Sequence, residues 1–343
     1  MTEKNLSARI IEQALKADIS NRDALLRFTR ERAHEAKSSP PSVAQLRNAL
    51  IHHTSKITER QRKIFLEMLK KRNIRSLSGV AIVTVLTKPF PCPGRCTYCP
   101  TEARMPKSYL SNEPAAARAL ALKFDPFIQV QSRIQTLEDN GHPTDKIELI
   151  IKGGTWSSYP TRYQQWFIKR CFEACNKRKA KSANLEEIQK INETAKHRII
   201  GLTIETRPDW ISLDEIVRLR TLGCTRVELG VQTTHGDILR VIRRDHGIAE
   251  VERAAALLRE AGFKVDFHLM PQLPGATPER DHEMIREIFS NENLRPDMIK
   301  IYPCLVLPNA LLYAQYKRGA YKPYSDKKLA EMLIRAKSEL IPR

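Results

Sequence analysis

The sequence predicts an α/β fold: an incomplete (β/α)6 TIM-like barrel that follows a helical, basic N-terminal region. From about residue 79, short β-branched runs alternate with amphipathic segments, which is typical of βαβ units and a parallel sheet. Six or so such runs fit an incomplete barrel better than a closed eight-stranded one. Before residue 79, apolar residues recur at helical spacing and Lys and Arg are frequent.

The N-terminal region, residues 1–75, is expected to be helical. Three segments carry apolar residues at spacings of three and four, as one face of a helix requires. These segments are residues 6–17, 42–53 and 58–71. The SSPPS stretch at 38–42 separates the first helical part from the second, and Ser42 is the expected N-cap. The region either binds a partner or packs on the next domain.

The net charge favours a polyanionic partner. The chain holds 58 Lys and Arg against 39 Asp and Glu, a formal net charge of +19. Residues 1–80 alone hold 17 basic against 8 acidic residues, and basic runs recur at 70–75, 176–181 and 240–244. Repeated runs indicate phosphate contacts, and therefore nucleic-acid binding, rather than only a solvated surface.

The sequence also predicts a cytoplasmic protein with no membrane partner. No apolar run approaches the roughly 18 residues that span a bilayer. The N-terminus, MTEKNLSARI, has no apolar signal core behind its charges. Seven cysteines in such a chain favour a metal site or reactive thiols over disulfides.

The barrel region, residues 76–310, holds six strand candidates. They are residues 80–87, 146–154, 197–206, 225–232, 264–270 and 298–303. Helices are expected between them at 163–178, 212–223, 250–262 and 279–289. In barrels of this kind, the loops after the carboxyl ends of the strands carry the chemistry. Residues 311–343 are expected to form a C-terminal helical segment.

The stretch PCPGRCTYCP, residues 91–100, follows the first strand candidate and spaces Cys92, Cys96 and Cys99 as C-x3-C-x2-C. Three thiolates on one loop can hold three irons of a cubane cluster and leave the fourth iron open to a non-protein ligand. A zinc site completed by a distant His and a redox C-x2-C pair are the alternatives. The remaining cysteines are expected to be packing residues: Cys171, Cys175, Cys224 and Cys304.

This spacing, with Tyr98 just before the third cysteine, resembles the cluster motif of the radical S-adenosylmethionine (radical SAM) superfamily. The resemblance implies a radical SAM barrel and a 4Fe-4S cluster on Cys92, Cys96 and Cys99. It also implies that S-adenosylmethionine binds the open iron through its amine and carboxylate. One electron from the cluster would then split the sulfonium into methionine and a 5′-deoxyadenosyl radical.

Further segments resemble superfamily motifs in their usual order: IIKGGTW, TIETRPDW, LGVQTTHGDILRVIRR and HLMPQLPGAT. The resemblance implies that Gly153 and Gly154 contact the methionine amine and that Glu205 is an acidic contact to bound S-adenosylmethionine. It also implies that Gln232 contacts the ribose, that Arg244 lies near the cofactor carboxylate and that His268 lies on the adenine side. Each segment taken alone also fits ordinary barrel packing.

From about residue 72 to the end, the chain resembles the catalytic subunit of Elongator, most specifically in SYLSNEP and in KIYPCLVLPNALLYAQYKRGAYKPY. The resemblance implies a tRNA-modifying enzyme that acts on carbon-5 of the wobble uridine in the anticodon stem-loop. Acetyl-CoA would be the co-substrate of the complete protein and the product a carboxymethyl-type uridine. Elongator-type protein partners or a homo-oligomer are also implied, and Lys152, Lys264 and Lys300 are candidate anticodon contacts.

Two features depart from the Elongator pattern. Many relatives carry one residue more between the first two cysteines of the loop. The family also normally continues into a C-terminal acetyltransferase domain, whereas this chain ends at Arg343, where that domain would begin. Residues 311–343 are therefore expected to lead to an absent acetyltransferase domain. The chain is interpreted as the radical portion of a longer protein or as a naturally short relative, without the complete acetyl-CoA-dependent activity.

Two other functions are weighed against this one. A different radical SAM enzyme that modifies RNA is one, but a methylthiotransferase would need a cysteine set before Cys92 and none is there. The other is a tRNA-binding module with a structural iron–sulfur or zinc site. That function would leave Glu205, Gln232 and Arg244 without a cofactor role.

Overall fold

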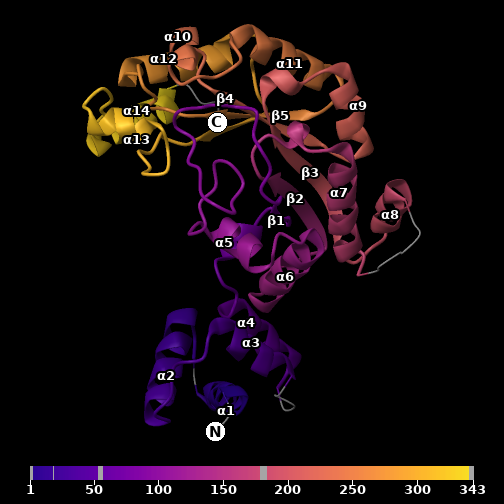
Figure 1. Ribbon diagram of the computed structural model, residues 1–343. Helices are drawn as coiled ribbons and strands as arrows, with labels where there is room; N and C mark the ends of the chain where they lie inside the picture. The colour runs from indigo at the N-terminus through magenta and orange to yellow at the C-terminus, as the bar shows by residue number, and fades with distance from the viewer. Residues whose placement is uncertain (1–2, 18, 53–56, 178–183, 340–343) are drawn as a thin grey trace. The chain divides into compact units, whose positions relative to one another are not determined.

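The computed structural model describes residues 3–17, 19–52, 57–177 and 184–339. The chain divides into two compact units (Figure 1). One comprises residues 1–82 and 131–147, and the other comprises residues 83–130 and 148–343. Parts of several predicted segments lie outside the described residues. These are residues 1–2, 18 and 53–56 of the N-terminal region, which include His53 of the helix at 42–53, residue 178 of the helix at 163–178, residues 178–181 of the basic run at 176–181, and residues 340–343 of the C-terminal segment.

The first unit is helical, as expected. Its helices are α1 (Glu3–Lys16), α2 (Arg22–Glu35), α3 (Val43–His52), α4 (Glu59–Met68), the 3-10 turn η1 (Asn73–Ser76) and the later part of α6 (Pro126–Asp139). Apolar side chains from α1 to α4, among them Ile10, Leu25, Leu50 and Phe65, form its core.

Capping residues explain where two of these helices begin. Ser42 is the N-cap of α3, as expected: its hydroxyl accepts from the Gln45 N–H at 3.3 Å, and the Gln45 side chain accepts from the Ser42 N–H at 2.7 Å. Helix α2 was not predicted as a separate element. Its start is set by Asn21, whose side chain accepts from the Ala24 N–H at 3.0 Å.

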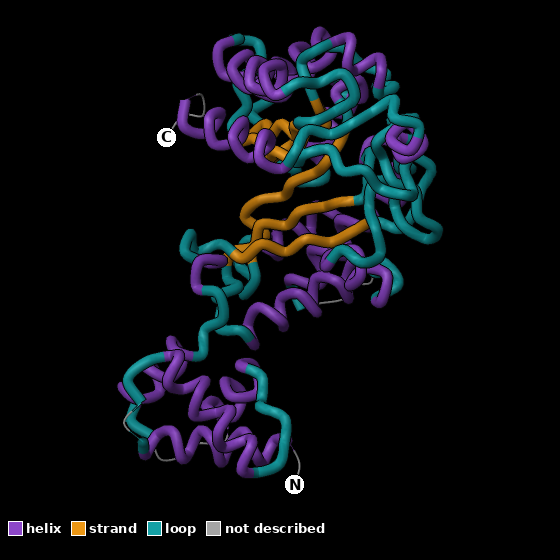
Figure 2. The backbone as a smooth tube through the Cα atoms, turned by 90° about the vertical axis from the view of Figure 1, so that its left-hand side faces the viewer, coloured by secondary structure: helices purple, strands orange, loops and turns teal. Residues whose placement is uncertain are grey.

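The six strands form one sheet in the order β1-β2-β3-β4-β5-β6, which confirms the incomplete barrel (Figure 2). They are β1 (Ala81–Leu86), β2 (Lys146–Lys152), β3 (Arg198–Thr206), β4 (Arg226–Gln232), β5 (Lys264–Leu269) and β6 (Met298–Ile301). The pairs from β3 to β6 are parallel. Because each strand from β1 to β5 is followed by a crossover to the next, the loops after the strands gather at one edge of the sheet.

Helices connect the strands and continue after the last one. They are α5 (Pro114–Ala121), α6, α7 (Thr161–Cys175), α8 (Leu185–Asn192), α9 (Leu213–Thr221), α10 (Gly236–Val241), α11 (Ile248–Glu260), α12 (Pro278–Ser290), α13 (Leu312–Lys317) and α14 (Asp326–Glu339), with 3-10 turns η2 (Trp156–Ser158) and η3 (Pro208–Trp210). The predicted helices between strands correspond to α7, α9, α11 and α12. Helices α5, α6, α8 and α10 were not predicted individually.

The cysteines outside the loop are packing residues, as expected. Cys171 and Cys175 lie on α7, and all four such cysteines are at most 1 % exposed. Within the described ranges, no helix is both long and apolar enough to cross a membrane.

Candidate active site

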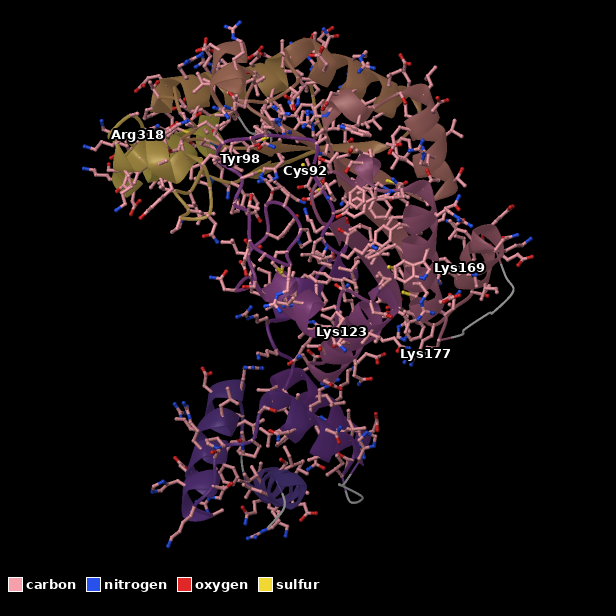
Figure 3. The ribbon with its side chains drawn as sticks, viewed as in Figure 1. Cys92, Tyr98, Lys123, Lys169, Lys177 and Arg318 are labelled. Atoms are coloured by element: carbon pink, nitrogen blue, oxygen red, sulfur yellow. The ribbon has the colours of Figure 1, made fainter. Side chains whose placement is uncertain are left out.

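The cysteine loop opens directly onto a cavity of about 260 Å³ at the carboxyl ends of the strands. Cys92, Cys96 and Cys99 all line it, as does Tyr98; Figure 3 labels Cys92 and Tyr98. Of the residues predicted to bind S-adenosylmethionine, five line the same cavity: Gly154, Glu205, Gln232, Arg244 and His268. The sixth, Gly153, is not part of the lining.

Gly153 packs beside the cavity instead. Its φ is +146°, in the region that favours glycine, and a Cβ there would overlap the hydroxyl of Thr87 just after β1. The glycine therefore lets the end of β2 lie close to Thr87. Gly154, with φ +93°, continues the same turn and exposes its backbone to the cavity.

Each loop sulfur has a polar neighbour from another segment. The Cys96 Sγ accepts from Nη1 of Arg244 at 3.3 Å, the Cys99 Sγ lies 3.0 Å from the Ser108 hydroxyl, and the Cys92 Sγ lies 3.7 Å from the Thr155 hydroxyl. The hydrogen bond from the Cys99 thiol, with the charge of Arg244, lowers the pKa of Cys96 to about 5. Cys96 is therefore suited to be a thiolate, while the same hydrogen bond and burial raise the pKa of Cys99 well above its ordinary value.

Arg244 joins the cysteine loop to the end of β4. It follows Arg243, whose left-handed φ of +57° ends the turn after α10. Its Nη2 donates to the carbonyl oxygen of Gly230, while Nη1 reaches Cys96. The guanidinium thus holds a fixed position in the cavity wall.

A second arginine of the cavity wall lies against the loop. Arg207, in the TRPD segment after β3, donates to both carboxylate oxygens of Asp209, at 2.9 and 2.8 Å, and to Asp245 at 3.0 Å. A Cβ on Gly94 would lie 2.6 Å from its Nη1. A glycine at position 94 of the loop therefore allows Arg207 to lie directly against it.

Strand register places a charged network in the cavity wall. Glu205 of β3 pairs in register with Glu228 of β4, and His268 of β5 pairs with Lys300 of β6. The Lys152 ammonium donates to Glu205 and, at 2.9 Å, to Glu228. Lys300 also donates to Glu228.

The network determines the charge of its members. Burial alone would raise the pKa of Glu228, but Lys152 and Lys300 lower it below its ordinary value. Burial lowers the pKa of His268 to about 4, despite the opposing effect of Glu228, so this imidazole is neutral at pH 7. Potential ligand atoms of Glu205, Glu228 and His268 lie within 4.8 Å of one another. Because two ammonium groups already hold the carboxylates, the cluster is an ion-pair network rather than a site for a divalent cation.

Gln232 is held in an unusual conformation at the end of β4. Its φ is +74°, rare for a non-glycine residue, and the β4–β5 register shifts between Leu229 and Gln232. Such irregularities re-aim a side chain next to a site. Among the described residues, Gln232 Oε1 and His268 Nε2 are buried without a hydrogen-bond partner, so the cavity offers them to a ligand.

Several site residues carried no role in the sequence analysis. Tyr109 and Ser108 belong to the SYLSNEP segment, and the Tyr109 hydroxyl donates to Glu205 at 2.7 Å. The sequence of that segment resembles the Elongator family but gives no indication of a contact with Glu205, because the two are far apart along the chain. Of the lysines considered for the anticodon, Lys152 and Lys300 join the charged network. Lys264 begins β5 and pairs with Asp297 at 2.7 Å, away from the carboxyl ends of the strands.

Comparison with known families agrees with this geometry. Residues 91–288 match the radical SAM superfamily. The chain belongs to this superfamily. Residues 296–343 also match the radical SAM C-terminal domain. The superfamily assignment implies a 4Fe-4S cluster and S-adenosylmethionine, and the donor set fits them: three cysteines on one loop border a cavity with unpartnered polar atoms.

Among radical SAM proteins, the chain is similar to the tRNA uridine(34) acetyltransferase of Methanocaldococcus infernus, with 50% identity over 287 residues, covering 82% of this chain and 53% of the relative. It is 35% identical to Elongator complex protein 3 of Homo sapiens over 339 residues, covering 95% of this chain and 60% of the relative. The resemblance to the Elongator catalytic subunit is thereby confirmed.

A solved structure is similar as well. The archaeal Methanocaldococcus infernus Elp3 with an N-terminal deletion (1-46) superposes with a TM-score of 0.66 at 46% identity, covering 77% of this chain and 55% of that one. The radical SAM chain described here thus spans about half the length of the curated relatives it matches.

Proposed function

We propose that this chain is the radical SAM portion of an enzyme that modifies carbon-5 of the wobble uridine in tRNA to a carboxymethyl-type uridine. One observation carries the proposal. A single cavity at the carboxyl ends of the strands brings the three loop cysteines together with Glu205, Gln232, Arg244 and His268. The names of the similar proteins, tRNA uridine(34) acetyltransferase and Elongator complex protein 3, support the choice of substrate.

In this proposal, Cys92, Cys96 and Cys99 hold the 4Fe-4S cluster. When bound, the cluster and S-adenosylmethionine together supply a 5′-deoxyadenosyl radical by one-electron cleavage of the sulfonium. Arg244 keeps a positive charge 3.3 Å from the Cys96 sulfur. That charge would balance the thiolates and attract a carboxylate.

The other residues of the cavity would orient the cofactor. Gln232 Oε1 would accept from a ribose hydroxyl, since it is buried without a partner. The backbone of Gly154 is open to the methionine amine. Glu205 is held by Tyr109 and Lys152, so its carboxylate has a fixed position from which to accept a hydrogen bond.

The substrate side of the proposal rests on charge and accessibility. An unpaired anticodon nucleotide can be splayed into a cavity mouth, whereas a paired one cannot. Residues 1–75 would bind tRNA phosphates, residues 76–310 form the barrel and residues 311–343 form a C-terminal segment. Acetyl-CoA is proposed as co-substrate of the complete protein. Elongator-type partners or self-association, and a cytoplasmic location, are part of the same proposal.

An anaerobic assay tests the radical function. The chain is reconstituted with iron and sulfide, dithionite and S-adenosylmethionine are added, and 5′-deoxyadenosine is quantified with and without tRNA. We expect product from the wild type, more product with tRNA, and none from Cys99→Ala. Cys175→Ala, which removes a buried thiol from α7, serves as the matched control and should retain activity.

The same assay separates the alternatives. A protein that holds a full cluster and binds tRNA but yields no 5′-deoxyadenosine would favour the tRNA-binding module with a structural metal site. Product that tRNA neither stimulates nor competes for would favour a radical SAM enzyme with a different substrate.

A further inference from the structure

A second cavity lies wholly within the N-terminal unit. It measures about 200 Å³, several times the roughly 30 Å³ that one water occupies in the liquid. Four cationic side chains line it: Lys71, Arg72, Arg75 and Arg133. The rest of the lining is mostly polar and comes from the end of α6 and the turn after it: Thr136, Leu137, Asn140 and His142.

The basic side of this cavity is an ordered turn rather than a loose tail. Arg22 donates to the carbonyl oxygens of Met68 and Lys70, at 2.7 and 2.6 Å, and so caps the end of α4. The Lys71 N–H donates to the Asn140 carbonyl at 3.1 Å. These bonds fix where the turn from Lys70 to Gly79 begins.

A buried contact fixes the other end of the turn. The Ser76 hydroxyl lies 2.9 Å from Nδ1 of His142, and both residues are buried. Between the two anchors, Arg72 has a left-handed φ of +56°. A strained non-glycine residue costs on the order of 1 kcal/mol and is most often retained at functional sites.

Most charges of the turn lack an acidic partner in the part of the chain that the structure describes. Among the residues that the structure describes, Lys71, Arg72 and Arg75 have no carboxylate within ion-pair distance. Two carboxylates of α6 accept hydrogen bonds from neutral groups: Glu138 from Thr144 at 3.1 Å and Asp139 from Gln135 at 2.8 Å.

His142 reports the resulting positive field. Burial lowers its pKa, and the positive charges of Lys70, Arg75 and Arg133 lower it further, against a hydrogen bond with the backbone of Lys71. A concave site with several cations and no acidic partner for most of them attracts an anion.

Two apolar side chains stand out on the same turn. Ile74 and Leu77 are 78 % and 76 % exposed, although both are large and aliphatic. They alternate in sequence with Arg72 and Arg75. Apolar side chains next to phosphate-binding cations are suited to contact sugar and base faces, which an isolated inorganic anion does not have.

We propose that the turn from Lys70 to Gly79, together with Arg133 and His142, binds a backbone phosphate of RNA, with Ile74 and Leu77 against the adjacent nucleotide. This inference rests on the proposed tRNA substrate and adds to it a defined phosphate site. Lys71, Arg72, Arg75 and Arg133 supply the charge, and the polar end of α6 completes the wall.

The test measures tRNA affinity of the full chain by fluorescence anisotropy over a series of salt concentrations. The double variant Lys71→Gln, Arg75→Gln should bind at least about tenfold more weakly at low salt. Its slope of log K against log salt should fall by about one, as expected for the loss of one phosphate contact. The matched control is Lys327→Gln, Lys328→Gln, which removes two exposed charges from α14, outside residues 1–75.

A second variant tests the apolar half of the site. Ile74→Ser, Leu77→Ser should weaken binding about threefold or more while leaving the salt slope unchanged. The residues substituted in the two double variants, Lys71, Arg75, Ile74 and Leu77, are all exposed. Both variants should therefore melt at the wild-type temperature, which a thermal unfolding curve checks.

The outcomes are distinguishable. Equal affinities and slopes for the wild type, the control and both variants would overturn this site while leaving the proposed tRNA substrate in place. No tRNA binding by the wild type would overturn both. A competition assay adds a third outcome. If an oligoglutamate displaced tRNA as readily as an RNA oligonucleotide does, the proposed phosphate site would also be overturned, because a general affinity for anions would then explain the binding.

Discussion

At the scale of single residues, the candidate active site depends on side chains that each hold two partners. Arg244 connects the Cys96 sulfur to the Gly230 carbonyl, and Glu228 connects Lys152 to Lys300. Neither role could be assigned from the motifs alone. The motif placed Arg244 near a carboxylate, whereas the structure shows its direct contact with the cysteine loop.

Arg244→Lys should impair cofactor binding more than cluster assembly. A lysine keeps the charge but lacks the planar fork that reaches both Cys96 and Gly230. The loss of one charge-assisted hydrogen bond, about 1.5 to 3 kcal/mol, corresponds to a fall in affinity of about 10- to 100-fold. Anaerobic calorimetry measures the affinity for S-adenosylmethionine of wild-type and variant proteins that hold equal amounts of iron. Arg240→Lys, on the exposed side of α10, is the control; equal affinities for both variants would contradict the prediction.

Glu228→Gln should destabilise the protein. Glu228 is 2 % exposed and neutralises two ammonium groups, so the amide would leave Lys152 with the carboxylate of Glu205 alone and would remove the carboxylate that pairs with Lys300. Removing one partner of a buried ion pair costs about 3 to 5 kcal/mol. A cost at the lower end of this range is expected here, because glutamine keeps the shape of the glutamate side chain. Urea unfolding followed by circular dichroism measures the loss, with the exposed Glu260→Gln as reference. An unchanged urea midpoint would show that the ion-pair network makes no net contribution to stability.

At the scale of elements, local sequence signals predicted the strands better than the helices. Each strand contains at least one β-branched residue, and each begins and ends within a few residues of its predicted position. Helices α5 and α6 lie between the cysteine loop and β2, and neither was predicted individually. Helix α10 has only six residues, too few to show a helical period.

The contact between α12 and the segment before α14 should make stability depend on pH. Asp281 on α12 is 1 % exposed and accepts from the Tyr324 hydroxyl and, at 2.7 Å, from the Gln272 N–H. Burial raises its pKa to about 7, although the Gln272 N–H and Arg280 act in the opposite direction. Between pH 4 and 7, the folded state therefore holds a proton that the unfolded state has released. This contribution to stability is complete below pH 4 and is lost as the pH rises through 7.

Asp281→Asn replaces the titrating carboxyl with an amide that does not titrate. The unfolding free energy of the wild type relative to that of the variant should therefore fall by on the order of 3 kcal/mol between pH 4.5 and 7.5. The wild type should lose stability relative to the variant as the pH rises. Urea titrations at the two pH values measure the difference, and Glu331→Gln on the exposed face of α14 is the control. A constant difference across this range would show that Asp281 is ionised throughout.

At the scale of the whole molecule, charge governs the interaction with RNA. The net charge of +19 is concentrated in the N-terminal part of the sequence, so phosphate contacts with counterion release should dominate affinity. Between 50 and 200 mM salt, binding of the full chain to tRNA should weaken by at least about tenfold, which as few as two phosphate contacts would produce. Fluorescence anisotropy at several salt concentrations checks this, and a salt-independent affinity would contradict it.

The sequence by itself determined the positions of the strands, the helical N-terminal region and the cysteine loop, because these depend on local periodicity, capping and spacing. Only the tertiary structure decided which side chains meet. Tyr109 reaches Glu205 across 96 positions of the chain, and Ser76 reaches His142 across 66. Such contacts depend on sheet register and on how helices close over distant segments. A one-residue change in register would turn Glu228 away from the cavity without altering any motif.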